Sequence, residues 1–317
     1  MTDTTDRTSA YEVVVVGSAN ADLVIEVARH PHAGETVLGG EVRRFPGGKG
    51  ANQAVAAARA GGARTAFLGA LGRDDGAAML RASLERGGVD TSHIVETDAE
   101  TGLAVITVSS DADNAIVVAP GANHRLVLDA AETDLVARAG AVLAQLEIPL
   151  DTVLAAARAA QGLFLLNAAP AQSLPPELLA QVDVLVVNEH EAAEVAGRPD
   201  GPAEPADLAH LAELAEALTE VVPAAVITLG SRGSLVARRD QPLVQIPSLP
   251  VQPVDTTGAG DTFCGVLAAQ LAAGADLPEA ARLASVAGAL ATTKHGAQPS
   301  VPTAAEVADA AQGLGRC

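Results

Sequence analysis

Short apolar runs alternate along the chain with longer segments whose apolar residues recur at helical spacing. The run at residues 12–17 (EVVVVG) is continuous, which is typical of a strand buried on both faces of a parallel sheet. Similar runs occur at residues 65–69, 141–146, 163–167, 184–187, 224–229 and 235–237. Helical patterns separate them at residues 51–60, 75–86, 131–138, 152–160, 205–218, 261–273 and 280–293, with a short helix near Pro176. This order predicts an α/β fold, a doubly wound, mostly parallel sheet flanked by helices.

Four further strand-like segments interrupt that alternation. They are residues 23–27, 35–45, 101–109 and 115–119. Because no helical pattern separates the members of each pair, we expect a separate four-stranded β-sheet that forms a discontinuous lid, approximately residues 21–46 and 101–120. Residues 1–10 are polar and predicted to be a disordered tail, and residues 11–317 are predicted to form a single domain.

Composition excludes several classes of partner. The net charge is −19, which argues against binding to nucleic acid or to an anionic membrane. Only 2% of residues are aromatic, so base stacking along a nucleic-acid strand is not expected. We find no pattern of a signal peptide or a transmembrane helix. The two cysteines, Cys264 and Cys317, have no metal-like spacing, and together these features favour a cytoplasmic protein.

Polar residues follow several of the predicted strands. Asn20 and Asp22 come just after the first strand, and because they are two residues apart they face the same way in extended chain. Glu147 and Asn188 follow later strands, as does the turn at residues 230–233. The carboxyl ends of strands are where open α/β sheets bind ligands, and Asn20 with Asp22 could grip sugar hydroxyls. The alternatives are an ordinary Asn/Asp turn and a hairpin turn with a solvent-exposed arginine.

Residues 254–263 (VDTTGAGDTF) combine a glycine-rich turn with the start of a helix. Unpaired N–H groups at a helix start suit an anion, and glycines let the backbone approach it closely. A carboxylate beside such a site is costly, so Asp261 needs a chemical reason to be there. We interpret it as the group that takes a proton while the turn holds a phosphoryl group. The alternative is a helix capped by Asp after a glycine turn.

Two other loops carry weaker signals. Residues 46–52 (PGGKGAN) open a helix, but Gly50 follows Lys49 where a Walker loop requires Ser or Thr. Gly48 and Asn52 could still approach a ligand there, unless the segment is a plain helix start. Residues 294–300 (KHGAQPS) could present carbonyl oxygens to a hard cation, or could be only a loop. The seven histidines show no metal-binding spacing.

Taken in order, the motifs resemble the ribokinase family of carbohydrate kinases from residue 12 to about residue 300. The resemblance rests on residues 17–22 (GSANAD), 46–54 (PGGKGANQA), 145–147 (QLE), 188–191 (NEHE), 228–233 (TLGSRG), 254–263 and 296–300 (GAQPS). It implies a four-stranded lid through which the chain forms a homodimer. It also implies ATP-dependent phosphorylation of the 5-hydroxyl of D-ribose, with Mg²⁺ and K⁺.

The resemblance also assigns residues. Asp261 matches the general base, and the backbone of Gly258, Ala259 and Gly260 matches the anion hole. The sugar site is matched by Asn20, Ala21, Asp22, Gly48, Lys49, Gly50, Ala51, Asn52 and Glu147, together with Asp261. The nucleotide site is matched by Asn188, Thr228, Leu229, Gly230, Ser231, Arg232, Gly233 and Ser285, with Gly260 and Asp261. Glu191 matches a Mg²⁺ and phosphate network, and the K⁺ site is matched by Asp255, Thr257, Ala291, Lys294, Gly296 and Ser300.

Two positions depart from the family pattern, and two kinds of alternative stay open. Ser285 stands where His or Asn is common near the adenine, and Thr257 replaces a commoner small or apolar residue. Related kinases act on deoxyribose, fructose, nucleosides or sugar phosphates. A nucleoside would favour an aromatic lid, in which Phe45 is the candidate, and a sugar phosphate would need basic residues such as Arg43 and Arg44. The other alternative is a non-catalytic sugar-binding regulator on the same scaffold.

Overall fold

The computed structural model describes residues 11–111, 113–198 and 207–314. Within those ranges the largest sheet has eight strands in the order β14-β13-β12-β11-β10-β9-β1-β4. All neighbours are parallel except the β12–β13 and β13–β14 pairs. The strands are β1 (Val13–Val16), β4 (Thr65–Leu68), β9 (Ala141–Ala144), β10 (Leu163–Asn167), β11 (Val184–Asn188), β12 (Ala224–Thr228), β13 (Ser234–Arg238) and β14 (Val244–Ile246). The predicted doubly wound, mostly parallel sheet is confirmed.

Helices cover both faces of this sheet. Alternate residues of β1 belong to two separate cores: Val13 and Val15 to one, Val14 and Val16 to the other. The first core includes α1 (Lys49–Arg59), α2 (Asp75–Arg86), α8 (Ala259–Ala272), α9 (Leu277–Ala291) and α11 (Ala304–Leu314). The second includes α3 (Ala130–Ala137), α4 (Leu150–Ala159), α5 (Pro176–Leu179), α6 (Glu189–Val195) and α7 (Leu208–Val221). Burial on both faces is why β1 is a continuous valine run rather than an alternating one.

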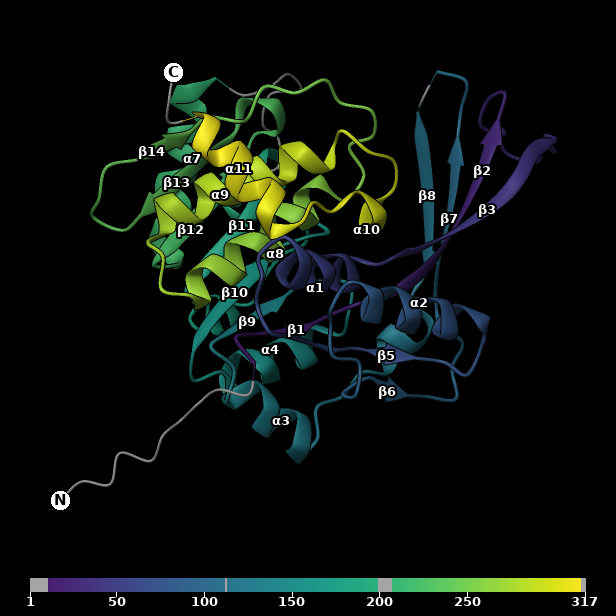
Figure 1. Ribbon diagram of the computed structural model, residues 1–317, viewed down its shortest axis with the longest axis horizontal. Coiled ribbons are helices and arrows are strands. Elements are labelled where there is room, and N and C mark those ends of the chain that lie inside the picture. The colour runs from purple at the N-terminus through teal and green to yellow at the C-terminus, as the bar shows by residue number, and fades with distance from the viewer. Residues whose placement is uncertain (1–10, 112, 199–206, 315–317) are drawn as a thin grey trace.

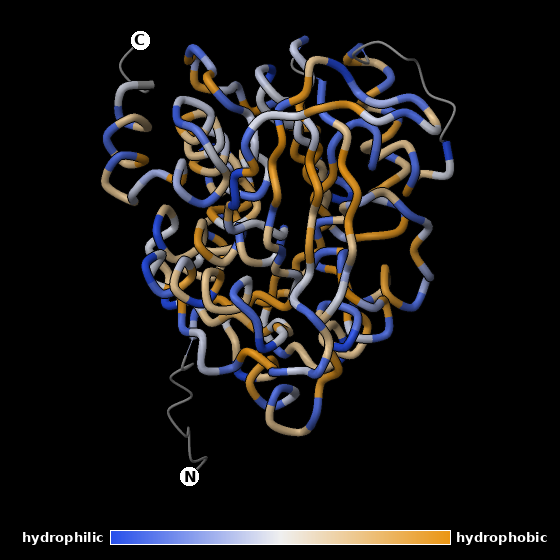
Figure 2. Tube along the Cα trace, turned by 90° about the vertical axis from the view of Figure 1, so that its right-hand side faces the viewer, coloured by the Kyte–Doolittle hydropathy of each residue, from blue (hydrophilic) through white to orange (hydrophobic). Residues whose placement is uncertain are grey.

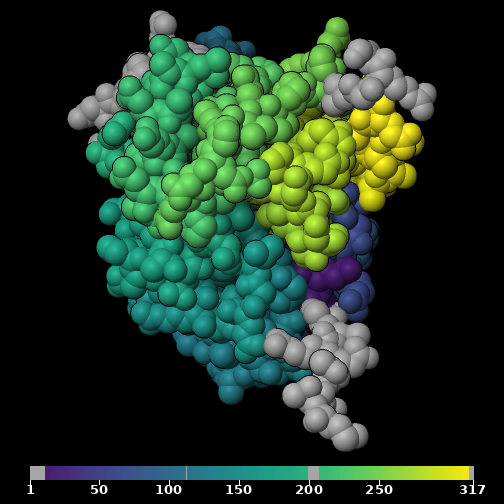
Figure 3. Space-filling model, turned by 90° about the vertical axis from the view of Figure 1, so that its left-hand side faces the viewer, coloured from purple at the N-terminus to yellow at the C-terminus, as the bar shows by residue number. Residues whose placement is uncertain are grey.

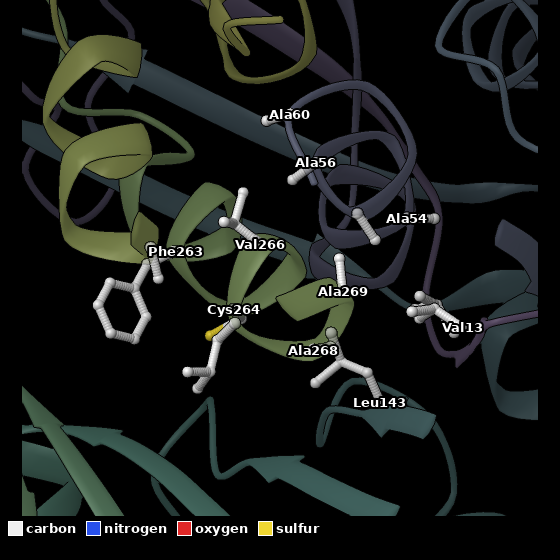
Figure 4. Packing of buried hydrophobic residues seen from close by; sticks show 14 of the residues in the cluster. Val13, Ala54, Ala56, Ala60, Leu143, Phe263, Cys264, Val266, Ala268 and Ala269 are labelled. Carbon is white, nitrogen blue, oxygen red and sulfur yellow. The ribbon is translucent and has the colours of Figure 1, made fainter. Parts of the chain in front are cut away.

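Helix α8 is deeply enclosed near the centre of the sheet. Every residue from Thr262 to Ala269 is buried. Figure 4 shows why: small side chains of α1, such as Ala56, lie on one side of α8, and Leu143 of the sheet lies on another. Small residues let the two helix backbones approach closely, and close packing gives α8 little freedom to shift. The chemistry-bearing residues at its amino end therefore stand on a rigid support.

A second sheet extends from the body of the molecule (Figure 1). Its strands are β2 (Asn20–Val27), β3 (Gly39–Gly47), β7 (Gly102–Val108) and β8 (Asn114–Ala119), in the order β3-β2-β7-β8. The β2–β7 pair is parallel and the other two pairs are antiparallel. Figure 2 looks onto this sheet and shows hydrophobic stretches along its strands. Figure 3 shows the opposite side of the molecule, which is formed largely by the middle and C-terminal parts of the chain.

Some local expectations were wrong. Residues 35–38 do not begin the lid strand, because the backbone N–H of His32 donates to Glu35 and closes a turn, and β3 starts at Gly39. We did not expect helices α6, α10 (Ala297–Ser300) and α11, strand β14, the small β5 (Ala70–Leu71) and β6 (Val95–Glu96) pair, or the 3-10 helix at Gly121–Arg125. The tail at residues 1–10, the predicted helix start at Pro205 and Cys317 lie outside the described residues.

Among the described helices, none combines the length and apolar character needed to cross a bilayer.

Candidate active site

Two adjoining cavities lie at the carboxyl ends of the parallel strands. The larger, of about 410 Å³, is lined by the turn after β12, by residues 248–251 and by α8 and α9. The smaller, of about 170 Å³, is lined by Lys49, Asn188, Glu191, Asp261 and neighbours. Thr228 and Gly260 line both cavities, so the two are continuous. The site is where a doubly wound sheet is expected to bind its ligand.

The loop after β1 packs directly on the start of α1. The N–H of Ala51 donates to the carbonyl of Ser18 at 2.8 Å. A Cβ on Gly50 would lie 2.6 Å from the Ser18 nitrogen, so only glycine allows this approach. The Ser18 hydroxyl donates to Glu147 Oε2 at 2.5 Å, and the N–H of Lys49 donates to the same oxygen at 3.1 Å. Three separate segments are thus joined at Glu147. The side chain of Ala51 lies in the core rather than in a cavity.

Asn20 stands at the junction of the two sheets and is held by a residue that sequence reasoning missed. Asn123 donates to Asn20 Oδ1 at 2.8 Å and to the Ala19 carbonyl at 3.2 Å, and accepts from the N–H of Ala19 at 2.9 Å. Asn123 is 1% exposed, so its amide hydrogen-bonds to Ala19 and Asn20 rather than to water. It lies in the turn before α3, 103 residues from Asn20, so no sequence spacing could reveal the pair.

Asp261 lies in the first turn of α8 and lines the smaller cavity. Both of its oxygens accept hydrogen bonds from side-chain amides of α1. Asn52 Nδ2 donates to Oδ2 at 2.9 Å, and Gln53 Nε2 donates to Oδ1 at 3.0 Å. Gln53 also donates to Asn167 Oδ1 at 2.9 Å. We assigned no role to Gln53, although it lies within the motif at residues 46–54, or to Asn167, the last residue of a predicted strand.

Several ionisable groups lie close enough around this site to affect one another's pKa. Burial raises the pKa of Asp22 to about 7, with further contributions from the carboxylates of Glu147 and Asp261. Burial also raises the pKa of Asp261, although Lys49 and the two amide donors oppose the shift. Burial lowers the pKa of the Lys49 ammonium, but Asp261, Glu147 and Glu191 outweigh burial and the net shift is upward. Lys49 therefore stays charged among carboxyl groups whose ionisation is costly.

The turn before α8 has the geometry of an anion site. Gly258 has φ 76° and ψ 4°, the left-handed conformation, and it directs the chain into the helix. The N–H of Ala259 donates to the Thr256 carbonyl at 3.2 Å, so it is already engaged. The N–H groups of Gly260 and Asp261 belong to the first helical turn, where no carbonyl of the same helix can accept from them. Those two groups are the ones best placed to face an anion.

The larger cavity collects most of the predicted nucleotide residues. Its lining includes Thr228, Gly230, Ser231, Gly233, Gly260 and Ser285. The Ser285 hydroxyl is buried, 3.4 Å from that of Ser234. Two predicted residues are placed elsewhere: the side chain of Leu229 is in the core, and Arg232 forms an ion pair with Glu189 at 2.6 Å. Residues 230–232 form a 3-10 turn between the antiparallel strands β12 and β13, as the hairpin alternative anticipated.

Asn188 and Glu191 form a capping box at the start of α6. The N–H of Glu191 donates to Asn188 Oδ1, and the N–H of Asn188 donates to Glu191 Oε2, each at 2.8 Å. The N-x-x-E pattern could have predicted this helix start. Glu191 nevertheless lines the smaller cavity, and burial raises its pKa. The box therefore fixes an acidic side chain at the edge of the site.

The predicted cation-site residues come from two segments that lie side by side. Asp255 accepts from the N–H of Gly296 at 2.8 Å and from the N–H of Thr257 at 2.9 Å. These hydrogen bonds outweigh burial and lower the pKa of Asp255. The Lys294 ammonium points away, to Glu306 at 3.2 Å, and the Ser300 hydroxyl donates to the Ala297 carbonyl at 2.8 Å. The Ala291 carbonyl accepts from the N–H of Lys294 at 3.3 Å.

Comparison with known proteins agrees with this site. Residues 10–304 match the model of the pfkB family of carbohydrate kinases. A ribokinase of Haemophilus influenzae is 39% identical over 301 residues, covering 93% of this chain and 96% of that protein. The fold is similar to that of Arabidopsis thaliana ribokinase complexed with ribose and ATP, with a TM-score of 0.87, 32% identity and coverage of 95% of this chain and 98% of the other.

A ribokinase from Thermotoga maritima aligns with a TM-score of 0.86 at 33% identity, covering 95% of this chain and 99% of that one. The match to the family model extends over almost the whole described chain, and it includes both sheets and all the site segments described above. The chain therefore belongs to the pfkB family of carbohydrate kinases.

Proposed function

We propose that this protein transfers the γ-phosphoryl group of ATP to the 5-hydroxyl of D-ribose, giving ribose 5-phosphate and ADP. The observation that carries the proposal is the position of Asp261. Its carboxylate stands in the first turn of α8, where the larger cavity meets a smaller polar one. A base at that junction can reach a hydroxyl on one side while helix N–H groups face a phosphoryl group on the other. Several relatives at 37–39% identity are ribokinases, which favours ribose as the sugar.

The transfer is an in-line displacement at the γ-phosphorus. Asp261 accepts the proton of the sugar hydroxyl as the hydroxyl oxygen forms its bond to phosphorus, and the bond between phosphorus and the β,γ-bridging oxygen breaks to release ADP. The N–H groups at the start of α8, with Gly258 setting their direction, stabilise the charge on the transferred oxygens. The Lys49 ammonium, which lines the smaller cavity, adds a positive charge to these N–H groups.

Ribose occupies the region between β2 and the start of α1. Asn20, Asp22 and Glu147 offer amide and carboxylate groups to its hydroxyls, with Gly48, Lys49 and Asn52 along one side. Glu147 raises the pKa of Asp261, and Glu147 and Asp261 both raise the pKa of Asp22, so these carboxyl groups interact electrostatically. Acceptors of this kind suit a neutral polyol and would repel an anionic sugar phosphate.

Magnesium fits the acidic character of the smaller cavity. In the described part of the chain no group of three or more His, Cys, Asp or Glu side chains is placed to hold a metal ion. Mg²⁺ commonly binds through one or two carboxylates together with substrate phosphates, and Glu191 provides such a carboxylate at the cavity edge. When bound with ATP, the ion would neutralise phosphate charge that the surrounding carboxylates otherwise oppose.

A potassium site fits the loops behind the anion-binding turn. Asp255 ties residues 255–257 to Gly296, and both segments bring carbonyl oxygens, which suit a hard monovalent ion. We propose that Asp255, Thr257, Ala291, Lys294, Gly296 and Ser300 surround it, with Lys294 contributing only its carbonyl. The ion would hold the turn at Gly258 in place and would not contact substrate.

The alternative substrates receive less support from the lid. Arg43 is paired with Glu26, its guanidinium carbon lies 6.0 Å from the centre of the Phe45 ring, and both Arg43 and Arg44 are exposed. Neither arginine is thus buried beside the sugar, as a sugar phosphate would require. Within the described strands of the lid Phe45 is the one aromatic residue, which offers little stacking surface to a nucleoside base.

The lid also supports a homodimer. Ile116, Val117 and Val118 of the edge strand β8 are 58%, 71% and 44% exposed. Three consecutive exposed apolar residues place hydrophobic side chains on both faces of an edge strand, and such an edge can pair with another chain. We propose that two lids pair through this sheet. A cytoplasmic location fits a kinase that uses ATP and keeps Cys264 as a free thiol.

A substrate panel tests the proposal. ADP formation should be measured with ATP and Mg²⁺ and each of D-ribose, 2-deoxyribose, fructose, adenosine and fructose 6-phosphate, in KCl and in NaCl at equal ionic strength. We expect the highest kcat/KM with D-ribose and faster turnover in KCl. A clear preference for another acceptor would replace ribose, and binding of sugar without any ADP formation would identify a non-catalytic regulator.

A further inference from the structure

Asp261 is held by a chain of amide groups that extends well beyond the cavity. Asn52, which donates to Asp261, itself accepts at Oδ1 from Gln298 Nε2 at 3.1 Å. Gln298 belongs to the short helix α10, and its own Oε1 accepts from the Ser83 hydroxyl of α2 at 2.6 Å. Ser83, Gln298 and Asn52 are 8%, 3% and 8% exposed, so water does not compete strongly for these groups.

The direction of these hydrogen bonds is uniform. Each amide accepts on its oxygen from the previous residue and donates through its nitrogen to the next, from Ser83 to Asp261. If the Asn52 amide turned over, its oxygen would face the Asp261 carboxylate and its NH₂ would face the NH₂ of Gln298. Both contacts would be repulsive, because each would place like groups together. The orientation of Gln298 therefore determines which group of Asn52 faces Asp261.

We propose that Gln298 is a positioning residue for Asp261 and acts through the side-chain amide of Asn52. The inference rests on the proposed phosphoryl transfer, for which Asp261 is the base. Gln298 touches neither cavity, since it lines neither of them. Gln298 keeps the Asn52 amide donating to Oδ2 of Asp261. The second lone pair of that oxygen then remains directed at the substrate hydroxyl.

The second oxygen of Asp261 has its own support, which makes the effect of Gln298 separable. Gln145 Nε2 donates to Gln53 Oε1 at 2.6 Å, and Gln53 donates to Asp261 Oδ1. Gln53 and Gln145 are fully buried, and Asn167, which also accepts from Gln53, donates to the Val186 carbonyl at 3.2 Å. Loss of Gln298 would leave this branch intact, so Asp261 should stay in place and lose the hydrogen bond to one oxygen.

The charge state of Asp261 provides a readout that packing alone would not change. The ionisable groups that act on Asp261 or respond to it are Lys49, Glu147, Asp22, Glu191 and Cys264. None of them is altered by a change at Gln298. The Asn52 hydrogen bond lowers the pKa of Asp261, so its loss should raise that pKa and move the acid limb of the kcat–pH profile to higher pH.

The test uses Gln298→Met, which keeps the approximate shape of the side chain, with Gln270→Met at the other end of α8 as the matched control. We expect Gln298→Met to lower kcat by about tenfold, the size of one lost hydrogen bond to a charged group, with the KM for ATP unchanged. Gln270→Met should behave as the wild type. If Gln298→Met fails to fold, Ser83→Ala frees the far end of the same chain and should lower kcat in the same direction by a smaller factor.

A double-mutant cycle then asks whether Gln298 acts through Asn52. In an Asn52→Ala background, Gln298→Met should change kcat by less than about twofold, because the intermediary is already gone. An equal loss in both backgrounds would overturn the proposal, as would a wild-type rate and pH profile in Gln298→Met. The pKa of Asp261, measured by carboxyl carbon NMR on the ligand-free protein, should rise in Gln298→Met. Because this pKa is measured without substrate, it tests the role of Gln298 even if the wild type phosphorylates a sugar other than ribose.

Discussion

Asn52 and Asp261 are 209 positions apart in the chain, yet the amide of the first donates to the carboxylate of the second at 2.9 Å. The contact joins α1, the helix that follows strands β2 and β3, to α8, the helix that follows the turn at Gly258. It exists because α1 and α8 pack side by side on one face of the sheet (Figure 4). The proposed sugar-binding and phosphate-binding parts of the site are therefore fixed relative to each other by helix packing rather than by a loop.

Replacing the proposed base should separate catalysis from binding. Asp261→Asn removes the proton acceptor, so kcat should fall by at least about 10²-fold. Ribose affinity, measured by calorimetry, should change little, because the other polar groups of the sugar site remain. Asp261→Ala serves as a check, since the asparagine amide would face the donors Asn52 and Gln53. Turnover within a few fold of wild type in both variants would remove the base assignment.

Two glycines of the same turn should respond differently to alanine. Gly258 has φ 76°, and a Cβ there would lie 2.9 Å from the Cα of Ala297, so Gly258→Ala should destabilise the fold by about 1–3 kcal/mol. A Cβ on Gly260 would meet open space, and the backbone there is ordinary helix, so Gly260→Ala should keep the wild-type Tm.

Gly260 lines both cavities, so a methyl group there should weaken nucleotide binding and slow turnover although the fold is unchanged. Thermal unfolding and the KM for ATP distinguish the two variants. The reverse pattern, with Gly260→Ala unstable and Gly258→Ala normal, would contradict the geometry of the turn.

The ionisation of Asp22 should make stability depend on pH. Its pKa rises from an ordinary value of 3.8 to about 7 on folding, so between these values the folded chain holds a proton that the unfolded chain has lost. Stability from this group is thus greatest below about pH 4 and is lost as the pH rises through about 7. At about pH 8, Asp22→Asn should increase the free energy of unfolding by on the order of 1–2 kcal/mol and so raise the Tm. Near pH 4 it should have little effect on either quantity.

Glu191 and Asp261 also have raised pKa values, so the variant should retain part of the pH dependence of the wild type. Thermal unfolding of the ligand-free protein at both pH values provides the comparison. An Asp22→Asn effect of the same size at each pH would show that Asp22 does not titrate in this range.

A charge on the lid edge should abolish the proposed dimer. Val117 is 71% exposed in the single chain, so Val117→Asp costs little in the monomer but places a carboxylate inside a paired lid. Leu208→Asp on α7, where the native leucine is 55% exposed, is the matched control and should leave the assembly unchanged. Light scattering after gel filtration measures the mass. A wild-type protein that is already monomeric at micromolar concentration would rule out the lid dimer.

The main sheet, the separate four-stranded sheet and the candidate site residues could be read from local sequence patterns. A strand that is buried on both faces needs consecutive apolar residues, which appear as a continuous valine run. Ligand-binding side chains at the carboxyl edge of the sheet appear as polar residues directly after a strand. The Asp261 turn was readable because its glycines and the helix start are neighbours in the chain, whereas the packing of Gly50 against Ser18 was not predicted. The capping box at Asn188 was also readable, although we first interpreted its residues only as ligands.

The amides that support those groups could be found only once the chain was folded. Asn123, Gln53, Asn167 and Gln298 are buried polar residues whose partners lie on other elements, so their spacing in the chain carries no signal. A buried amide must find its hydrogen bonds wherever packing places a partner. The charge states of Asp22 and Asp261 likewise depend on burial and on neighbours brought together by folding. The motif at residues 254–263 identifies Asp261, whereas the packing of α1 against α8 determines which side chains hydrogen-bond to it.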